Sequence, residues 1–135
     1  MENPQPLFDQ LKSLLASQYL AVLATSRQGH PYTNLVAFAP SDDLRQLIFV
    51  TGASTRKFAN IQSDPCASML IDNRSNRPSD VAYAMAATAS GSARVAAEAE
   101  LADFKARYLA RHPHMETFVH SPSTMCIVLE VDRYY

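Results

Sequence analysis

The sequence predicts a small, mainly β domain, an antiparallel barrel of about six strands with about three flanking helices. Three observations lead to this fold class. Short apolar runs of strand type are separated by polar turns, the first three runs follow one another as hairpins, and only one strand-helix-strand step occurs before residue 72. A parallel, doubly wound sheet would instead alternate strands and helices along the chain.

The composition is that of an ordinary globular domain. The chain has 135 residues, of which 47% are hydrophobic and 19% charged, and its net charge is -1. We assign residues 1–135 to a single domain, because this length suits one hydrophobic core. The near-neutral charge argues against a nucleic-acid partner. With no apolar run long enough to span a membrane and no secretion signal at the start, we expect a cytoplasmic protein without a membrane partner.

The first part of the chain is predicted to form a helix, a hairpin and a third strand. Residues 6–17 carry leucines and a phenylalanine at helical spacing. The apolar runs 19–26 and 31–39 flank a polar turn at residues 27–30, which is the pattern of a β-hairpin. After a second polar turn, residues 46–52 form the next strand of an antiparallel meander.

A short helix and a further strand follow. Gly52 breaks the preceding strand, and Ser54 or Thr55 can cap a helix that runs to Ser63. Residues 66–72 have the composition of a strand, and the polar loop that follows contains two arginines that offer a second anion contact.

The second part of the chain contains one ambiguous region. Residues 81–100 are rich in alanine, which favours a helix, but the threonine, serines and glycine among them do not, so the pattern alone leaves helix and strand open. Residues 101–112 have a clear helical pattern. Residues 124–135 alternate as a final strand with one better-buried face.

The cysteines and histidines offer weak candidates for chemistry. Cys66 and Cys126 lie far apart in apolar runs and are expected to be buried, reduced thiols. His112, His114 and His120 would suit a metal or haem if their segment were extended, but no ligand pattern completes a site, so we favour a surface helix end and predict no metal. No nucleophile elbow accompanies any serine, and the catalytic residues stay unknown.

The strongest local candidate is the start of the helix after Gly52. Acidic side chains are favoured in the first turn of a helix, yet this one opens with Arg56 and Lys57. Backbone N–H groups, the hydroxyls of Ser54 and Thr55 and the two cations together suit a phosphate monoester. The alternative is that both cations are simply solvated. The chain has no P-loop and no dinucleotide fingerprint.

Two segments of the chain resemble a known family, the FMN-binding split-barrel proteins related to pyridoxamine 5'-phosphate oxidase. They read ASQYLAVLATSRQGHPYTNLVAFAP and LIFVTGASTRKFANIQSDPCASMLID, and the most specific part is TGASTRKFANIQSDP after a strand. The resemblance implies a six-stranded antiparallel split β-barrel of Greek-key type. It also implies that the anion at the helix start is the phosphate of FMN, bound by Ser54, Thr55, Arg56 and Lys57.

The same resemblance implies further parts of a flavin site. The second hairpin strand would run beside the isoalloxazine ring, with Tyr32, Thr33, Asn34 and Leu35 as cofactor-binding residues. Family members are typically homodimers with FMN at the subunit interface, so a partner chain would complete the site. Residues 83–99 are identified as strand by resemblance, with a small-residue surface that would admit the partner or the flavin at Ala84, Ala86, Ala87 and Ala89.

The sequence also departs from the true pyridoxamine phosphate oxidases. Those enzymes carry an arginine in the second strand, where this chain has Tyr32-Thr33-Asn34, and a C-terminal segment with substrate-binding Arg and His. We therefore expect an FMN-dependent oxidoreductase with another small-molecule substrate, for which Tyr32 and His30 are the only nearby acid-base candidates. Two alternatives stay open: a haem-binding or haem-degrading split-barrel protein, and a non-catalytic flavin-binding protein.

Overall fold

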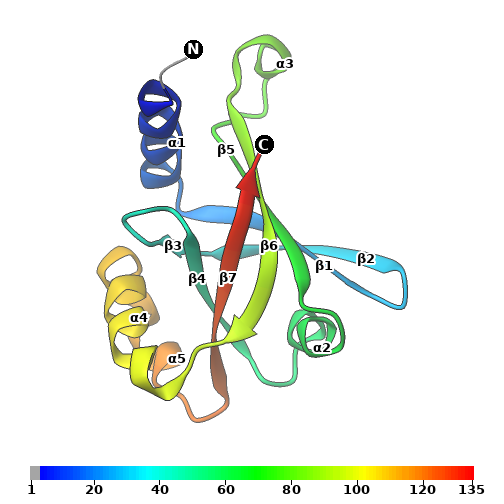
Figure 1. The fold of residues 1–135 in the computed structure, drawn as a ribbon, viewed down its shortest axis with the longest axis vertical. Helices are drawn as coiled ribbons and strands as arrows, with labels where there is room; N and C mark the ends of the chain where they lie inside the picture. Colours follow the sequence, from blue (N-terminus) through cyan, green and yellow to red (C-terminus); the bar gives the residue numbers. More distant parts are fainter. Residues whose placement is uncertain (1–3) are drawn as a thin grey trace.

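Seven antiparallel strands form one curled sheet in the computed structural model, which describes residues 4–135 (Figure 1). The strands are β1 (Leu20–Arg27), β2 (His30–Ala37), β3 (Ala39–Pro40), β4 (Gln46–Gly52), β5 (Cys66–Asp72), β6 (Ala86–Val95) and β7 (Thr124–Tyr134). The helices are α1 (Gln5–Ser17), α2 (Arg56–Ser63), α3 (Asp80–Tyr83), α4 (Glu98–Arg111) and α5 (Glu116–Val119), with a 3-10 turn at Pro113–Met115.

The order of the strands explains why the sheet curls. Neighbouring strands follow the order β2-β1-β5-β6-β7-β4-β3, so β2 and β3 form its two edges. These edge strands are separated in the chain by Phe38 alone, which is fully buried. A flat sheet cannot have both edges joined by one residue, so the sheet closes on itself into a half-barrel around its core.

The predicted mainly β, antiparallel fold is confirmed, but the counts of six strands and three helices are too low. The apolar run at residues 31–39 divides between β2, which pairs with β1, and the two-residue β3, which pairs with β4. The three predicted helices correspond to α1, α2 and α4, and the two additional helices have only four residues each. Helices this short leave no periodic pattern that a sequence can reveal.

The ambiguous alanine-rich region is a strand only over β6. The prediction of strand over residues 83–99 is wrong at both ends, because Tyr83 belongs to α3 and residues 98 and 99 already belong to α4. The Glu100 carboxylate accepts a hydrogen bond from the Ala97 N–H at 2.7 Å and so caps this helix start. In the middle of β6 a β-bulge brings Gly91 against β7, where a Cβ atom would lie 1.8 Å from the Glu130 carbonyl oxygen.

The core has two parts that lie on either side of β4 and β7. Leu23, Phe49 and Leu129 belong to the cluster inside the half-barrel, whereas Ile48 and Val128 belong to a second cluster under α4. Both faces of β7 are therefore buried over Cys126–Leu129, and the prediction of one better-buried face is wrong there because α4 covers the other.

Three further predictions from the sequence are corrected by burial. Cys126 is buried, and burial raises the pKa of its thiol to about 11, but Cys66 is exposed at the start of β5. His112 is buried at the end of α4 and not on the surface. Ala87 and Ala89 face the core whereas Ala84 and Ala86 are exposed, so the four alanines do not form one surface. Among the described residues, no helix is long and apolar enough to cross a membrane.

Candidate phosphate site at the start of helix α2

Helix α2 is fixed to the half-barrel by its apolar and amide side chains. Phe58 and Ile61 are buried in the core cluster inside the sheet. Asn60 is also buried, and its Nδ2 donates to the Thr25 hydroxyl of β1 at 3.1 Å. These contacts hold α2 against the sheet, so the backbone from which Arg56 and Lys57 extend has a fixed position.

The loop between β4 and α2 is organised by Thr55. Its Oγ1 accepts a hydrogen bond from the Phe58 N–H at 3.3 Å, lies 2.7 Å from the Thr51 hydroxyl and donates to the Gly52 carbonyl at 3.0 Å. Thr55 is thus the N-cap of α2. Its hydroxyl has no hydrogen-bonding capacity to spare, and we assign it to shaping the loop around the first turn of the helix.

The two cations of the first turn have no acidic partner. Among residues 4–135 neither Arg56 nor Lys57 forms an ion pair. The Arg56 guanidinium lies 5.4 Å from the centre of the Tyr32 ring, a cation–π contact that directs it toward β2. Partial burial lowers the pKa of the Lys57 amine, because the charged form has lost part of its water. An anion at this position would restore that lost stabilisation.

A cavity of about 560 Å³ opens beside this turn. It is lined by Arg27, Gln28, His30, Pro31, Tyr32, Ser54, Thr55, Arg56, Ala59 and Asn60. The lining contains two guanidinium groups and an imidazole but no carboxylate. The backbone N–H groups of the first helical residues, which have no intrahelical acceptors, add further positive potential. This set of groups is suited to an anion.

The structure brings together part of the predicted flavin site. Tyr32, Ser54, Thr55 and Arg56 line one cavity, and Lys57 follows Arg56 in the same turn. The remaining predicted residues, Thr33, Asn34 and Leu35, continue along β2 beyond the lining of the cavity.

Strand β2 offers one unused backbone edge and one unused side-chain acceptor. It is the end strand of the sheet, so the edge that faces away from β1 has no strand partner among residues 4–135. The Oδ1 atom of Asn34 is buried and has no hydrogen-bond partner in the described part of the chain. A buried acceptor of this kind costs stability unless a ligand or a partner supplies a donor.

Three residues that line this cavity, Arg27, Gln28 and Asn60, were not singled out from the sequence. His30, which the sequence offered as an acid-base candidate, also lines it. The signal for Arg27 and His30 was the hairpin itself, since a two-residue turn places the flanking residues opposite each other. Asn60 left no signal, because an amide on a helix gives no hint of its burial.

The C-terminal histidines do not form a second site. His112 Nε2 lies 2.7 Å from the Phe38 carbonyl oxygen, and burial lowers the pKa of its imidazole. No group of three or more metal-ligating side chains occurs among residues 4–135. The arginine loop at residues 73–80 is also separate, because it lies at the opposite end of the molecule from α2 (Figure 1). Arg74 there pairs with Asp72 at 3.0 Å.

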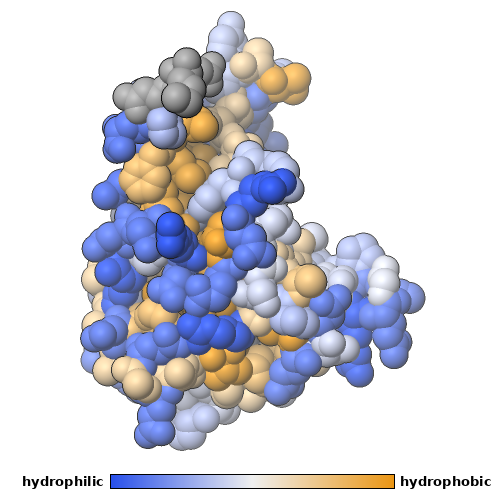
Figure 2. Space-filling view, viewed as in Figure 1, coloured by the Kyte–Doolittle hydropathy of each residue, from blue (hydrophilic) through white to orange (hydrophobic). Residues whose placement is uncertain are grey.

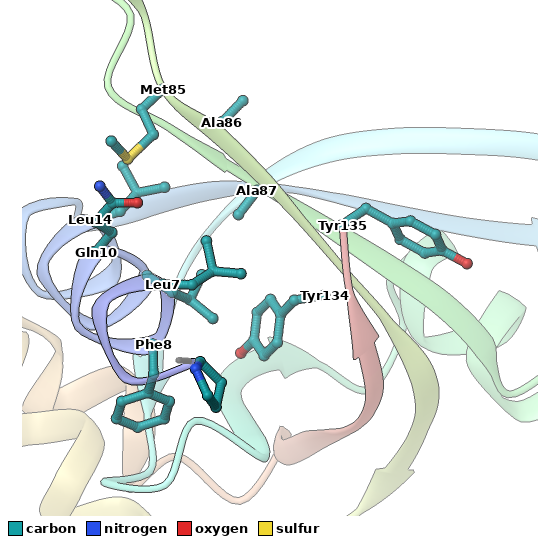
Figure 3. A pocket seen from close by; sticks show the side chains of 11 residues that line it. Leu7, Phe8, Gln10, Leu14, Met85, Ala86, Ala87, Tyr134 and Tyr135 are labelled. Atoms are coloured by element: carbon teal, nitrogen blue, oxygen red, sulfur yellow. The ribbon is translucent and has the colours of Figure 1, made fainter. Parts of the chain in front are cut away.

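A second cavity, of about 400 Å³, has a different character. It lies between α1, the start of β6 and the end of β7, where apolar side chains gather in the space-filling view (Figure 2). Leu7 of α1 and Tyr134 of β7 lie on either side of it, and Met85 closes one end (Figure 3). The Tyr134 hydroxyl donates to the Leu44 carbonyl at 2.7 Å, and no charged residue lines the cavity. It therefore does not suit a phosphate.

Comparison with known proteins places this geometry in context. Residues 7–135 match the family model described as pyridoxamine 5'-phosphate oxidase. A search of curated protein sequences found no significant match.

Solved structures share the fold at low sequence identity. A heme binding protein from Mycobacterium smegmatis has a TM-score of 0.85 and 21% identity over 99% of this chain, which spans 54% of that protein. HutZ, the heme storage protein from Vibrio cholerae, has a TM-score of 0.80 and 15% identity, with 94% of this chain and 92% of that chain covered. A FAD-binding protein from Mesorhizobium loti has a TM-score of 0.74 and 12% identity, with 93% and 87% covered.

Proposed function

The chain belongs to the pyridoxamine 5'-phosphate oxidase family, and from this premise we propose that it is a split-barrel flavoprotein that binds FMN by its phosphate at the start of α2. The observation that carries the proposal is a cavity lined by cations without a carboxylate, next to a half-buried lysine without an ion pair among residues 4–135. An unpaired, partly desolvated ammonium is costly, and such groups gather at binding sites.

Each group of the helix start has a distinct role in this proposal. Arg56 binds two phosphate oxygens with its planar guanidinium. Lys57, whose side chain is partly buried, supplies a single positive charge. The Ser54 hydroxyl, which is exposed, donates to the phosphate. Thr55 contributes by capping the helix, because its own hydroxyl is engaged within the loop.

The ring system of the flavin is proposed to lie along β2. The open backbone edge at Thr33 and Leu35 offers N–H and C=O groups to its polar edge, and Asn34 Oδ1 is an acceptor without a partner among the described residues. FMN, when bound, supplies hydride and electron transfer, so the proposed activity is that of an oxidoreductase with a small-molecule donor and acceptor. The protein's part is to hold and orient the cofactor.

A homodimer is part of the same proposal. The outer face of four strands carries two rows of uncharged side chains across β2, β1, β5 and β6. The rows are Leu35–Val22–Leu70–Thr88 and Thr33–Ala24–Ser68–Ser90. Leu35 is 63% exposed in the isolated chain. Two rows without charge meet their own copy without repulsion, and a copy placed there would reach the part of β2 that is proposed to hold the flavin.

The test is the double substitution Arg56→Ala/Lys57→Ala. We expect the purified wild-type protein to retain about one FMN per chain after desalting, with the two visible bands of oxidised flavin. The double variant should lose at least a hundredfold in FMN affinity, because it removes both charges that contact the phosphate. Light scattering should give the mass of a folded dimer for both proteins, since neither Arg56 nor Lys57 forms an ion pair among residues 4–135 that the substitution would break.

The matched control is Arg74→Ala/Arg77→Ala, which removes the same charge from the exposed loop at the other end of the molecule. It should leave FMN affinity unchanged. Equal FMN affinity in the wild type and in the helix variant would refute the site, and a monomeric mass would refute the dimer.

Haem binding is the second candidate function, and it is favoured by the likeness in fold to the heme proteins of Mycobacterium smegmatis and Vibrio cholerae. Since His112 is buried and held by the Phe38 carbonyl, an axial ligand from a histidine of this chain would come from His30, His114 or His120, which are exposed. A wild-type protein that fails to hold FMN but develops a Soret band on titration with haemin would replace the flavin proposal by this one.

A further inference from the structure

The turn between β1 and β2 places two basic side chains opposite each other. Arg27 and His30 are cross-strand partners on either side of Gln28 and Gly29. Both turn residues have positive φ angles, 52° and 77°, as in the tight hairpin turns that match the twist of a sheet. Directly paired residues of an antiparallel hairpin lie on the same face, so the guanidinium and the imidazole share one side of the hairpin.

That side is the one that carries helix α2. Two residues farther from the turn on each strand, the next pair on the same face is Thr25 and Tyr32. Thr25 accepts the hydrogen bond from α2, and Tyr32 lies under the Arg56 guanidinium. With a rise of about 3.3 Å per residue, the basic pair lies about 7 Å farther out, toward the hydrophilic tip of the hairpin (Figure 2). Both basic residues line the same cavity as Arg56.

Nothing acidic in the described chain neutralises this pair. Arg27 forms no ion pair among residues 4–135. Asp64, which follows α2, does not line the cavity and forms no ion pair among the described residues; its Oδ2 accepts from the Ser26 hydroxyl at 3.3 Å and its Oδ1 from the Cys66 N–H at 3.0 Å. The cavity therefore has more positive charge than the single phosphate at Arg56 and Lys57 requires, and the excess lies on its outer side.

We propose that Arg27 and His30 form a second phosphate subsite beside the one at α2, and that the protein thereby takes a dinucleotide. The inference rests on the proposed FMN-phosphate site and extends it outward. Two sources offer the same chemistry at this position. One is the adenylate phosphate of FAD, which is joined directly to the flavin phosphate, and the other is a phosphate of a nicotinamide dinucleotide that binds beside FMN.

The test compares Arg27→Gln/His30→Gln with the wild type in binding titrations at fixed ionic strength. Flavin fluorescence gives the Kd values of riboflavin, FMN and FAD, and calorimetry gives the Kd of NADPH on the FMN-loaded protein. We expect FAD or NADPH to bind about tenfold more weakly to the variant, while FMN changes less than threefold and riboflavin not at all. Weakening of FAD identifies the flavin dinucleotide as the source, and weakening of NADPH alone identifies the donor.

The control variant is Arg77→Gln/His120→Gln, which makes the same chemical change at exposed positions away from the cavity. It should leave all four Kd values unchanged. The inference is overturned if both dinucleotides keep their affinity in the hairpin variant, or if FMN weakens as much as they do, which would mean one shared anion site. A wild-type protein that binds no FMN at all would instead refute the proposed function, and the subsite with it.

Discussion

Two arginines of this protein have similar surroundings but opposite roles. Arg56 and Arg111 each lie over an aromatic ring, at 5.4 Å from the Tyr32 ring and 5.1 Å from the Phe38 ring, and each is followed by a second basic residue. Arg111 donates to the carbonyl oxygen of Leu15 at 3.0 Å and also to that of Gln18. For Arg56, the ring is the only side-chain partner within residues 4–135.

The residues that follow the two arginines repeat the contrast. His112 is buried and its Nε2 is used by the Phe38 carbonyl, whereas the half-buried Lys57 has no ion pair in residues 4–135. Arg111 uses its two terminal nitrogens on backbone carbonyls, while its buried Nε has no hydrogen-bond partner among the described residues, and these two bonds tie the end of α4 to the end of α1. The proposed site differs in that its cations face a cavity without any backbone carbonyl or carboxylate partner among residues 4–135. We therefore take the absence of a partner at a cavity, more than basic residue type, as the mark of the proposed binding site.

The largest expected effect on folding comes from Arg111→Met. The substitution keeps much of the apolar volume but leaves the carbonyl groups of Leu15 and Gln18 without their donor. We expect a loss of about 3 kcal/mol in the free energy of unfolding, because two bonds to a charged group are removed together. This corresponds to a fall in Tm of about 10 °C in a thermal melt.

Arg107→Met on the same helix is the control. Arg107 pairs with the exposed Asp42 at 3.0 Å and has one longer bond to a backbone carbonyl, that of Pro40 at 3.3 Å, so its loss should lower stability less than that of Arg111. FMN affinity should be unchanged in both variants once they are folded. If Arg111→Met weakened FMN binding in folded protein, or left Tm unchanged, the two arginines would not have the separate roles that their contacts indicate.

A smaller effect is expected from the titration of His112. Burial lowers its pKa from the ordinary value of 6.5, with the charge of Arg111 acting in the same direction. As the pH falls below about 6.5, the unfolded chain binds a proton that the folded chain does not, so stability decreases until the pH reaches the lower, folded-state pKa. Above about pH 6.5 the imidazole is neutral in both states and the full stability is present.

Denaturant melts between pH 7.5 and pH 5 measure this dependence. His112→Gln, which keeps a donor for the Phe38 carbonyl, should make the free energy of unfolding less dependent on pH in this range. His120→Gln, at an exposed position, should leave the dependence as it is in the wild type. An unchanged slope in the His112 variant would show that the buried imidazole does not cause the loss of stability in acid.

Much of the fold could be predicted from the sequence because its signals are local. The polar turns bounded β4 and β5 at the residues where the structure places them, and the leucine spacing gave α1 within one residue. The alanine-rich β6 was different, because alanine has no preference for a strand and only the pairing with β5 and β7 decides the conformation. The burial of His112 depends on the hydrogen bond to the Phe38 carbonyl, which is remote in the sequence, and on packing against the Tyr108 ring. Neither contact produces a periodic pattern in the sequence.

The candidate site was predictable to the extent that it lies in one stretch of chain. Arg56 and Lys57 break the rule that acidic residues occupy the first turn of a helix, and that conflict pointed to an anion. The contribution of β1 and β2 was harder to foresee, since Arg27 and His30 join the cavity only through the hairpin register. The use of Thr55 as a cap is also a matter of geometry, because a threonine before a helix can serve either the helix or a ligand.

The smallest expected effect is a change in FMN affinity, and it concerns the aromatic ring beside Arg56. Tyr32→Leu removes the ring that directs the Arg56 guanidinium but leaves the guanidinium itself. A cation–π contact at an exposed site contributes about 0.5–1 kcal/mol, so the Kd of FMN should rise about two- to fivefold. Tyr32→Phe keeps the ring and should bind FMN as the wild type does. A hundredfold loss in the leucine variant would mean that Tyr32 contacts the cofactor directly, and equal affinity in all three proteins would mean that Arg56 reaches the phosphate without guidance from the ring.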